Sequence, residues 1–252
     1  MALQLALDGR IALVTGAATG IGRAIAVAMA QAGATVVVNH LGREALAAAA
    51  VADIAAAGGD AWAVEADVSR GEAVQGMIRV VLARHGRIDV LVNNAGIVLD
   101  KPFLETTEAE WDRVIATDLK SVFLCAQAAL PAMLAQGSGC IINIASELGY
   151  LGRANFTAYT AAKAGVITLT RALAREFAPR VRINAIAPGP IDTPMLSLDH
   201  MSAEAIAKES DIPMRRVGRP DEIAGTAVFL ASDLASFYCG QTLSPNGGAL
   251  MA

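Results

Sequence analysis

The stretch that decides the fold is a glycine-rich turn near the start of the chain, Thr15-Gly16-Ala17-Ala18-Thr19-Gly20-Ile21-Gly22. It follows an apolar run, Ile11–Thr15, that is typical of a buried strand, and it leads into Gly20–Ala32, which is typical of a helix. Glycines in such a turn let the backbone approach a pyrophosphate, which the first N–H groups of the helix can bind. The spacing is G-x-x-x-G-x-G rather than the common G-x-G-x-x-G, and no G-K-[ST] sequence indicates a P-loop nucleotidase. The turn predicts a dinucleotide site, with a plain tight connection as the alternative.

Outward from this turn, apolar runs alternate with alanine-rich segments along the whole chain. Further strands are expected at 35–39, 61–66, 90–92, 140–145, 182–187 and 242–243. Further helices are expected at 44–57, 70–85, 158–177 and 221–231, and over 108–135, a stretch that could break near Asp118. Strands that alternate with helices form a parallel sheet covered on both faces. We therefore expect one α/β domain over residues 1–252, doubly wound, with about seven parallel strands and helices on both faces.

The segment 191–219 departs from this rhythm. It carries Pro194, Pro213 and several polar residues where the next helix is due. A long excursion of this kind in a compact domain is usually a lid or a binding loop. We expect it to cover the substrate.

Composition excludes several classes of protein. The chain has 252 residues, of which 54% are hydrophobic and 17% charged, so it is not a disordered chain. Its net charge of -4 argues against a broad nucleic-acid interface. The uncharged stretches 24–42 and 121–136 are interrupted by polar residues or proline, so we expect no membrane span, and without a signal peptide we expect a cytoplasmic protein. Three cysteines and three histidines at wide spacings predict neither disulfides nor a metal site.

The end of the second predicted strand bears on the choice of cofactor. It reads Asn39-His40-Leu41-Gly42-Arg43, with no carboxylate before Glu44. Enzymes that select NAD usually place an acid here to hold the ribose hydroxyls. Its absence removes repulsion toward a 2′-phosphate, which Arg43 could attract, although Arg43 could also be a solvated charge. We expect NADP to be preferred, with NAD as the alternative.

Three side chains form a candidate acid–base group. Tyr159 and Lys163 are four residues apart in a predicted helix, so they share one of its faces. A tyrosine with an ordinary pKa of about 10 needs a drop of roughly 3 units to act near neutral pH, and an ammonium group and a cofactor cation can supply it. Ser146 follows a strand thirteen residues before Tyr159, at the sheet edge where ligands bind, and no Gly-x-Ser-x-Gly sequence surrounds it. Taken singly, these residues could equally be a surface pair and a capping serine.

These motifs occur in order with three others. Asp67 follows the third strand, Asn93-Asn94-Ala95-Gly96 follows the fourth, and Pro188-Gly189 with Thr193 follows the sixth. From Gly9 to Gly248 the chain resembles the short-chain dehydrogenase/reductase (SDR) superfamily. The resemblance implies a Rossmann fold, an NAD(P)-dependent oxidoreductase acting on CH–OH groups, and a homotetramer.

The resemblance also implies roles for individual residues. Tyr159 would be the general acid/base, Lys163 would lower its pKa and bind the nicotinamide ribose, and Ser146 would orient the substrate oxygen. With the end of the second strand included, the expected cofactor-binding residues are Gly16, Thr19, Gly20, Ile21, Asn39, His40, Arg43, Asp67, Val68, Asn94, Ala95, Gly96, Tyr159, Lys163, Pro188, Gly189, Ile191 and Thr193.

Three positions depart from the commonest pattern of the family. Asp118 stands where many members have a fourth catalytic residue, an Asn that binds a water through its backbone carbonyl, so we expect Asp118 to serve in its place. Thr19 stands where many NADP-preferring members have Arg or Lys, which weakens the case for NADP. Asn246 replaces the usual Asp before Gly247-Gly248, and we expect a structural role near a subunit contact.

The substrate is the least determined feature. The expected lining residues are Ser146, Glu147, Tyr150, Leu151, Asn155, Pro190, Met195 and Leu196. Glu147 could bind a hydroxyl of a polyol or be a solvated loop charge. The chain resembles both 3-oxoacyl-acyl-carrier-protein reductases and sugar or polyol dehydrogenases. Of two basic docking positions typical of the carrier-protein enzymes, Arg180 matches one and Gly137 does not match the other.

We therefore expect hydride transfer between a nicotinamide and a small ketone or secondary alcohol, such as a polyol, a sugar or a general ketone. A 3-oxoacyl-acyl-carrier-protein reductase is the alternative. Two remoter alternatives are a non-redox dinucleotide sensor, against which the intact Ser146, Tyr159 and Lys163 argue, and an epimerase or dehydratase. We expect no metal and no nucleic-acid partner.

Overall fold

Seven parallel strands form one sheet, in the order β3-β2-β1-β4-β5-β6-β7, in the computed structural model, which describes residues 5–251. The strands are β1 (Ile11–Val14), β2 (Thr35–His40), β3 (Asp60–Glu65), β4 (Val90–Asn93), β5 (Gly139–Ile144), β6 (Val181–Ile186) and β7 (Thr242–Leu243). Each boundary lies within one residue of the sequence prediction. The doubly wound α/β architecture is thereby confirmed.

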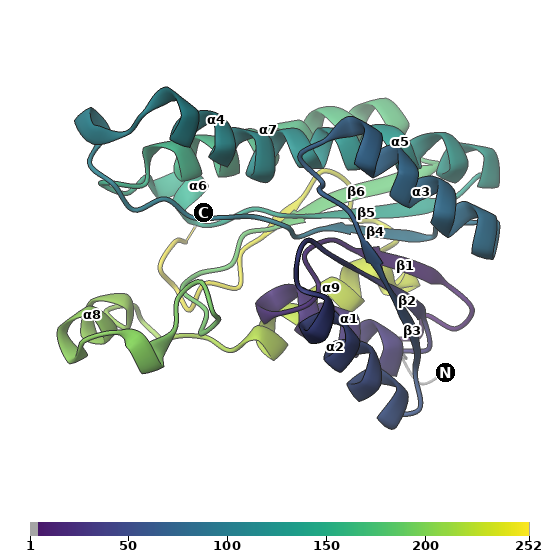
Figure 1. Ribbon diagram of the computed structural model, residues 1–252, viewed down its shortest axis with the longest axis horizontal. Coiled ribbons are helices and arrows are strands. Elements are labelled where there is room, and N and C mark those ends of the chain that lie inside the picture. The colour runs from purple at the N-terminus through teal and green to yellow at the C-terminus, as the bar shows by residue number, and fades with distance from the viewer. Residues whose placement is uncertain (1–4, 252) are drawn as a thin grey trace.

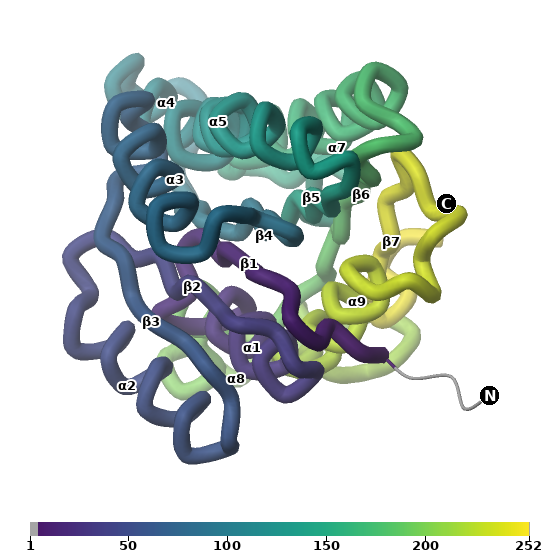
Figure 2. The backbone as a smooth tube through the Cα atoms, turned by 90° about the vertical axis from the view of Figure 1, so that its right-hand side faces the viewer, coloured from purple at the N-terminus to yellow at the C-terminus, as the bar shows by residue number. Residues whose placement is uncertain are grey.

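Helices cover both faces of this sheet (Figures 1 and 2). One face carries α1 (Gly20–Gln31), α2 (Glu44–Ala56) and α9 (Pro220–Ala231). The other carries α3 (Gly71–His85), α4 (Glu108–Ile115), α5 (Ser121–Gln136) and α7 (Thr157–Phe177). The central strands β1 and β4 are buried at every residue because helices cover both faces of the sheet, whereas the edge strand β3 is partly exposed.

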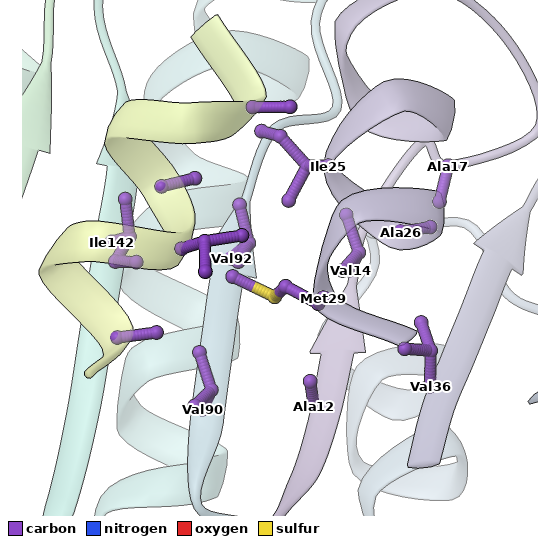
Figure 3. Close-up of a cluster of buried hydrophobic side chains, with 14 of the residues drawn as sticks. Ala12, Val14, Ala17, Ile25, Ala26, Met29, Val36, Val90, Val92 and Ile142 are labelled. Carbon is purple, nitrogen blue, oxygen red and sulfur yellow. The ribbon is translucent and has the colours of Figure 1, made fainter. Parts of the chain in front are cut away.

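One part of the hydrophobic core lies beneath α1 and α9. Figure 3 shows Met29 of α1 between the two helices, beside Val14 and Val92 of the sheet. All three side chains are fully buried. Burying side chains of this size contributes about 1.5–3 kcal/mol each. This packing holds α1 against the sheet.

The helix predicted over 108–135 runs from Glu108 to Gln136 without a break, and near Asp118 it changes to a π-helical turn. A π-helical turn, Ala116–Lys120, joins α4 to α5 and places Asp118 in the interior. In the described chain this combined stretch, Glu108–Gln136, is the one helix long and apolar enough to cross a membrane. Cys125, Ala129 and Met133 of α5 pack into the core, however, and core helices of this kind also meet that criterion.

The excursion 191–219 contains more regular structure than the sequence indicated. It includes a short 3-10 turn, Leu198–His200, and the helix α8 (Ala203–Glu209), which Ser202 caps by accepting the Ala205 N–H at 3.2 Å. Figure 1 shows α8 standing apart from both helical layers. A second unpredicted helix, α6 (Leu148–Leu151), follows Ser146. In the chain, α6 follows the carboxyl end of β5 and α8 follows that of β6.

Candidate active site

The strand order reverses between β1 and β4, and side chains at their carboxyl ends hold the glycine-rich turn in place. The Thr15 hydroxyl accepts the N–H groups of Asn94 at 2.9 Å and of Ala95 at 3.0 Å. The Asn94 side chain donates to the carbonyls of Thr15 at 2.9 Å and Gly16 at 3.2 Å. Asn94 therefore braces the turn rather than offering a free side chain to a ligand.

The turn itself is a cradle that a side chain would fill. Gly16 and Gly20 have φ of +62° and +56°, in the left-handed region. A Cβ at Gly22 would lie 2.4 Å from the Asn94 side-chain nitrogen. No side chain caps α1, whose first N–H groups thus remain available to an anion. These features fit the pyrophosphate of a dinucleotide.

At the end of β2, two of the predicted cofactor residues are buried and the third is exposed. Asn39 is buried, and its side chain accepts the Gly16 N–H at 3.2 Å and donates to the Ala66 carbonyl at 3.1 Å. His40 is also buried. Arg43 is exposed at the start of α2. Glu65, at the end of the neighbouring strand β3, accepts the Gly42 N–H at 3.0 Å through its carboxylate. Sequence reasoning missed this acid because it is distant from Gly42 in the chain.

The remaining predicted cofactor residues lie at the same sheet edge. Asp67 accepts the N–H and hydroxyl of Ser69 at 2.9 and 2.6 Å, and Val68 packs into the core. Thr193 lies next to Gly20, since a Cβ added to Gly20 would lie 3.4 Å from the Thr193 side chain. The other predicted positions at this edge are half-buried or buried, namely Thr19, Ile21, Ala95, Gly96, Pro188, Gly189 and Ile191.

Asn246 has the structural role expected of it. It is buried, and a Cβ at Gly189 would lie 2.7 Å from its Cα. Its side chain accepts the Gly248 N–H at 2.8 Å and donates to the Leu250 carbonyl at 2.9 Å. Asn246 therefore orders the C-terminal segment against the loop after β6 that carries Pro188 and Gly189.

The structure gathers the predicted acid–base residues between β5 and α7. Lys163 is buried, donates to the Ile144 carbonyl at 3.1 Å, and has its Nζ 5.5 Å from the centre of the Tyr159 ring. The Ser146 hydroxyl donates to Glu147 Oε2 at 3.0 Å and accepts the Leu148 N–H at 3.2 Å. A hydroxyl, a phenol and an ammonium thus meet at the ligand-binding edge of the sheet.

Burial and three neighbouring charged groups act on the pKa of Tyr159. Burial raises the pKa of the phenol, Lys163 and the Ser146 hydrogen bond lower it, and Asp118 and Glu147 raise it, so that it lies above its ordinary value. The nearby ammonium therefore does not by itself produce the depressed pKa that the sequence argument required. A protonated Tyr159 can donate a proton to a carbonyl oxygen, which the Ser146 hydroxyl can hold when it turns from Glu147, and a bound nicotinamide would supply the hydride.

The predicted substrate residues do not all lie together. Tyr150 lines a 590 Å³ cavity with Arg171, Cys239 and Thr242, and none of Ser146, Tyr159 and Lys163 lines it. Pro190 lines a separate 200 Å³ cavity beside Asn246. Glu147 is the candidate in direct contact with Ser146.

The other substrate candidates are mostly at the surface. Asn155 is exposed, in the left-handed region at φ 69°, and its carbonyl accepts the Lys101 N–H at 2.9 Å. Leu151 and Met195 are exposed. Leu196 is half-buried and donates its N–H to the Thr193 carbonyl at 3.0 Å.

Sequence reasoning also missed a cluster of side chains at the start of α7. The Arg153 guanidinium lies 4.8 Å from the Phe156 ring centre, and the Phe156 ring packs edge-on against Tyr159 at 6.5 Å. Arg153 also pairs with Glu209 of α8. Contacts between such distant positions leave no pattern in a single sequence. No three metal-ligating side chains gather anywhere among residues 5–251.

Comparison with known proteins agrees with this geometry. The family model described as Enoyl-(Acyl carrier protein) reductase matches residues 16–249. The chain is 46% identical to the 3-oxoacyl-[acyl-carrier-protein] reductase of Staphylococcus aureus, over 95% of this chain and 98% of that protein.

Two solved structures are similar over nearly the whole chain. A protein from Beutenbergia cavernae, provisionally described as an NAD(P)-dependent gluconate 5-dehydrogenase and solved with NADP at low occupancy, has a TM-score of 0.91 and 42% identity, over 97% of this chain and 98% of that one. One from Agrobacterium tumefaciens, provisionally described as a gluconate dehydrogenase, has a TM-score of 0.94 and 38% identity, over 99% and 100%. With the glycine cradle and the Ser146, Tyr159 and Lys163 group in place, the chain belongs to the short-chain dehydrogenase/reductase family and is an NAD(P)-dependent oxidoreductase.

Proposed function

We propose that the protein transfers a hydride reversibly between NADP(H) and a small ketone or secondary alcohol that bears a hydroxyl group beside the reacting carbon. The observation that carries this proposal is the Glu147 carboxylate, buried and one hydrogen bond from the Ser146 hydroxyl. Ser146 is the one side chain in the described chain that donates to it. A carboxylate in this position can accept a hydrogen bond from a substrate hydroxyl.

Burial raises the pKa of Glu147 to about 7, and the Ser146 hydrogen bond offsets part of that rise. Near neutral pH the carboxylate form is therefore substantially present. A 3-oxoacyl thioester presents carbonyl oxygens at its reacting end, and these accept hydrogen bonds but donate none. Leaving a buried carboxylate without a donor costs free energy, so Glu147 favours a hydroxylated substrate.

The second candidate is a 3-oxoacyl-acyl-carrier-protein reductase, which the relatives named with that activity favour. Arg180, exposed beyond the end of α7, would be one docking residue for an acidic carrier. Gly137, which follows α5, supplies no second positive charge. We place this activity second for that reason.

A matched pair of ketones tests the proposal, with NADPH as donor: acetoin and butan-2-one, which differ by one hydroxyl, alongside an acetoacetyl thioester. We expect kcat/KM for acetoin to exceed that for butan-2-one by at least about tenfold. Glu147→Leu should bring the two values together, whereas the exposed control Glu72→Gln should leave their ratio unchanged. A thioester preferred over both ketones in the wild-type enzyme would contradict the proposal and favour the second candidate.

For the cofactor, we propose NADP over NAD, held by the residues of the glycine turn and the exposed Arg43. The absence of an acid within the end of β2 supports this choice. The neighbour from Beutenbergia cavernae, solved with NADP, also supports it.

We further infer that 191–219 is the substrate lid, that residues 1–252 form one functional domain, and that the protein is cytoplasmic.

We also propose a homotetramer. Phe237 is 99% exposed, and Leu234 and Tyr238 beside it are exposed as well, near the sheet edge formed by β7. An apolar patch at an open sheet edge is typical of a subunit interface. Light scattering during gel filtration should give four times the mass of one chain, and Phe237→Asp should dissociate the assembly. A wild-type monomer would contradict this proposal.

A further inference from the structure

The carboxylate of Asp118 adjoins the catalytic lysine inside the protein. Asp118 is fully buried in the π-helical turn between α4 and α5. Its Oδ1 accepts the Ile97 N–H at 2.9 Å, and its Oδ2 lies 3.3 Å from Lys163 Nζ without any other polar partner in the described chain. Gly96 lies close to the same carboxylate, since a Cβ added to Gly96 would lie 2.9 Å from Asp118 Oδ2.

The consequence is a change in the charge that Tyr159 meets. Lys163 has the carboxylate on one side and the Tyr159 ring on the other. A neutral side chain at position 118 would leave a net positive charge beside the phenol. Burial raises the pKa of Asp118 above its ordinary value, whereas the Lys163 ammonium at 3.3 Å and the Ile97 N–H favour its ionised form. With Asp118 ionised, the phenol faces an ion pair with no net charge, and this matters because Coulomb interactions are strong at buried sites.

The charged groups that face Tyr159 are few. Lys163 lies on its own helix, Asp118 on the turn before α5, and Glu147 at the end of β5, with the neutral Ser146 beside it. Lys163 favours the phenolate, whereas Asp118 and Glu147 oppose it. Burial lowers the pKa of Lys163, but the Asp118 carboxylate opposes this and the pKa lies above its ordinary value, so the lysine stays protonated at neutral pH.

We propose that Asp118 is a positioning residue that acts as the counter-ion of Lys163 and thereby keeps the Tyr159 hydroxyl protonated at neutral pH. The active site is then set to donate a proton to a ketone. Removing a proton from an alcohol requires a higher pH or additional positive charge nearby. This role concerns the side chain of Asp118, whereas the role expected from the family concerns a backbone carbonyl.

Ultraviolet difference titration of the cofactor-free protein tests the proposal without using activity. The absorbance of ionised tyrosine is followed against pH, and the Tyr159→Phe variant is subtracted so that the titration of Tyr159 alone remains. In the wild type this signal should stay small below about pH 10. In Asp118→Asn, which keeps the shape of the side chain and removes the charge, the midpoint should move to lower pH by about one unit or more.

Activity provides a second readout that a purely structural role would not move. The acid limb of the pH profile for alcohol oxidation should shift to lower pH in Asp118→Asn, in parallel with the absorbance midpoint. Asp118→Ser, smaller and also neutral, repeats both measurements if the asparagine variant folds poorly. Equal midpoints in the wild type and both neutral variants, or a shift to higher pH, would overturn the proposal. Neither result depends on which substrate is preferred, so this test stands apart from that of the proposed function.

Discussion

Arg153 and Glu209, 56 residues apart in the chain, meet in a two-pronged ion pair with nitrogen–oxygen distances of 3.2 and 2.5 Å. Their side chains are only 29% and 11% exposed. Glu209 ends α8, and Arg153 stacks on Phe156, which packs against Tyr159. The pair therefore ties the excursion 191–219 to the start of α7.

Reversing one charge of this pair should loosen the excursion and weaken substrate binding. In Arg153→Glu or Glu209→Arg, like charges would face each other, and KM should rise about tenfold while kcat changes less, because such pairs are typically coupled by about 1–2 kcal/mol. The double variant should recover most of the loss. Steady-state kinetics and protease cleavage within 191–219 measure the two effects.

The matched control is the other charge pair near α8. Arg215 and Asp211 are 77% and 78% exposed, and a pair this exposed contributes little. Asp211→Asn should therefore leave KM unchanged. If the double variant were no better than the singles, the ion pair would not be the connection that holds the excursion.

Much of the fold was predictable, and for a physical reason. Strands that are buried on both faces are mostly apolar, so they appear as runs such as Val36–Val38, and their limits were predicted to within one residue. Ser146, Tyr159 and Lys163 were also predictable together, because strand ends and helix periodicity place them at one edge.

The surroundings of several other predicted residues depend on tertiary contacts that a single sequence does not encode. Whether Tyr150 faces the substrate depends on α6, a single helical turn whose orientation no periodicity encodes. Asn39 and Asn94 looked like ligand-binding residues, but their hydrogen bonds brace the turn from distant strands. The pairing of Arg153 with Glu209 likewise follows from tertiary packing alone.

Glu147 should make the stability of the protein depend on pH. Burial raises the pKa of this carboxyl from its ordinary 4.5 to about 7 in the folded chain. Folding then takes up a proton between these pH values, so the free energy of unfolding falls as the pH rises through this window. The Gln side chain in Glu147→Gln does not titrate, so this variant does not show that fall in the free energy of unfolding. Relative to the wild type, the variant should gain at most about 3 kcal/mol between pH 4.5 and pH 8.

Chemical denaturation at the two pH values measures this difference, with Glu72→Gln as the exposed control. The control should show no such gain. A Glu147→Gln variant whose stability relative to the wild type is the same at both pH values would show that the carboxyl titrates normally in the folded chain.

Gly22 should tolerate no side chain, in contrast to a matched helical glycine. A Cβ at Gly22 would lie 2.4 Å from the Asn94 side chain and 2.6 Å from the Gly16 carbonyl. Gly22→Ala should therefore lower the free energy of unfolding by about 1–3 kcal/mol and weaken dinucleotide binding. A Cβ at Gly225 of α9 would meet nothing within 4 Å, so Gly225→Ala should be stabilising by up to about 1 kcal/mol. Thermal melts and dinucleotide titration separate the two, and equal effects would show that the turn around Asn94 can yield.

Arg43 and Glu65 should act in opposite directions on the choice between NADP and NAD. Arg43 is exposed at the start of α2, where a 2′-phosphate could be reached, and Glu65 accepts the N–H of the adjacent Gly42 at 3.0 Å. Arg43→Ala removes a positive charge and should weaken NADPH binding several-fold more than NADH binding. Glu65→Gln removes a negative charge but keeps a hydrogen-bond acceptor for Gly42, so it should strengthen NADPH binding selectively. Fluorescence titration with NADPH and with NADH gives two dissociation constants for each variant. Glu72→Gln, which changes the net charge as Glu65→Gln does, should leave the selectivity unaltered. If Arg43→Ala weakened both nucleotides equally, the 2′-phosphate would not be bound by this residue, and Glu65 would become the stronger candidate for contacting the ribose hydroxyls of NAD.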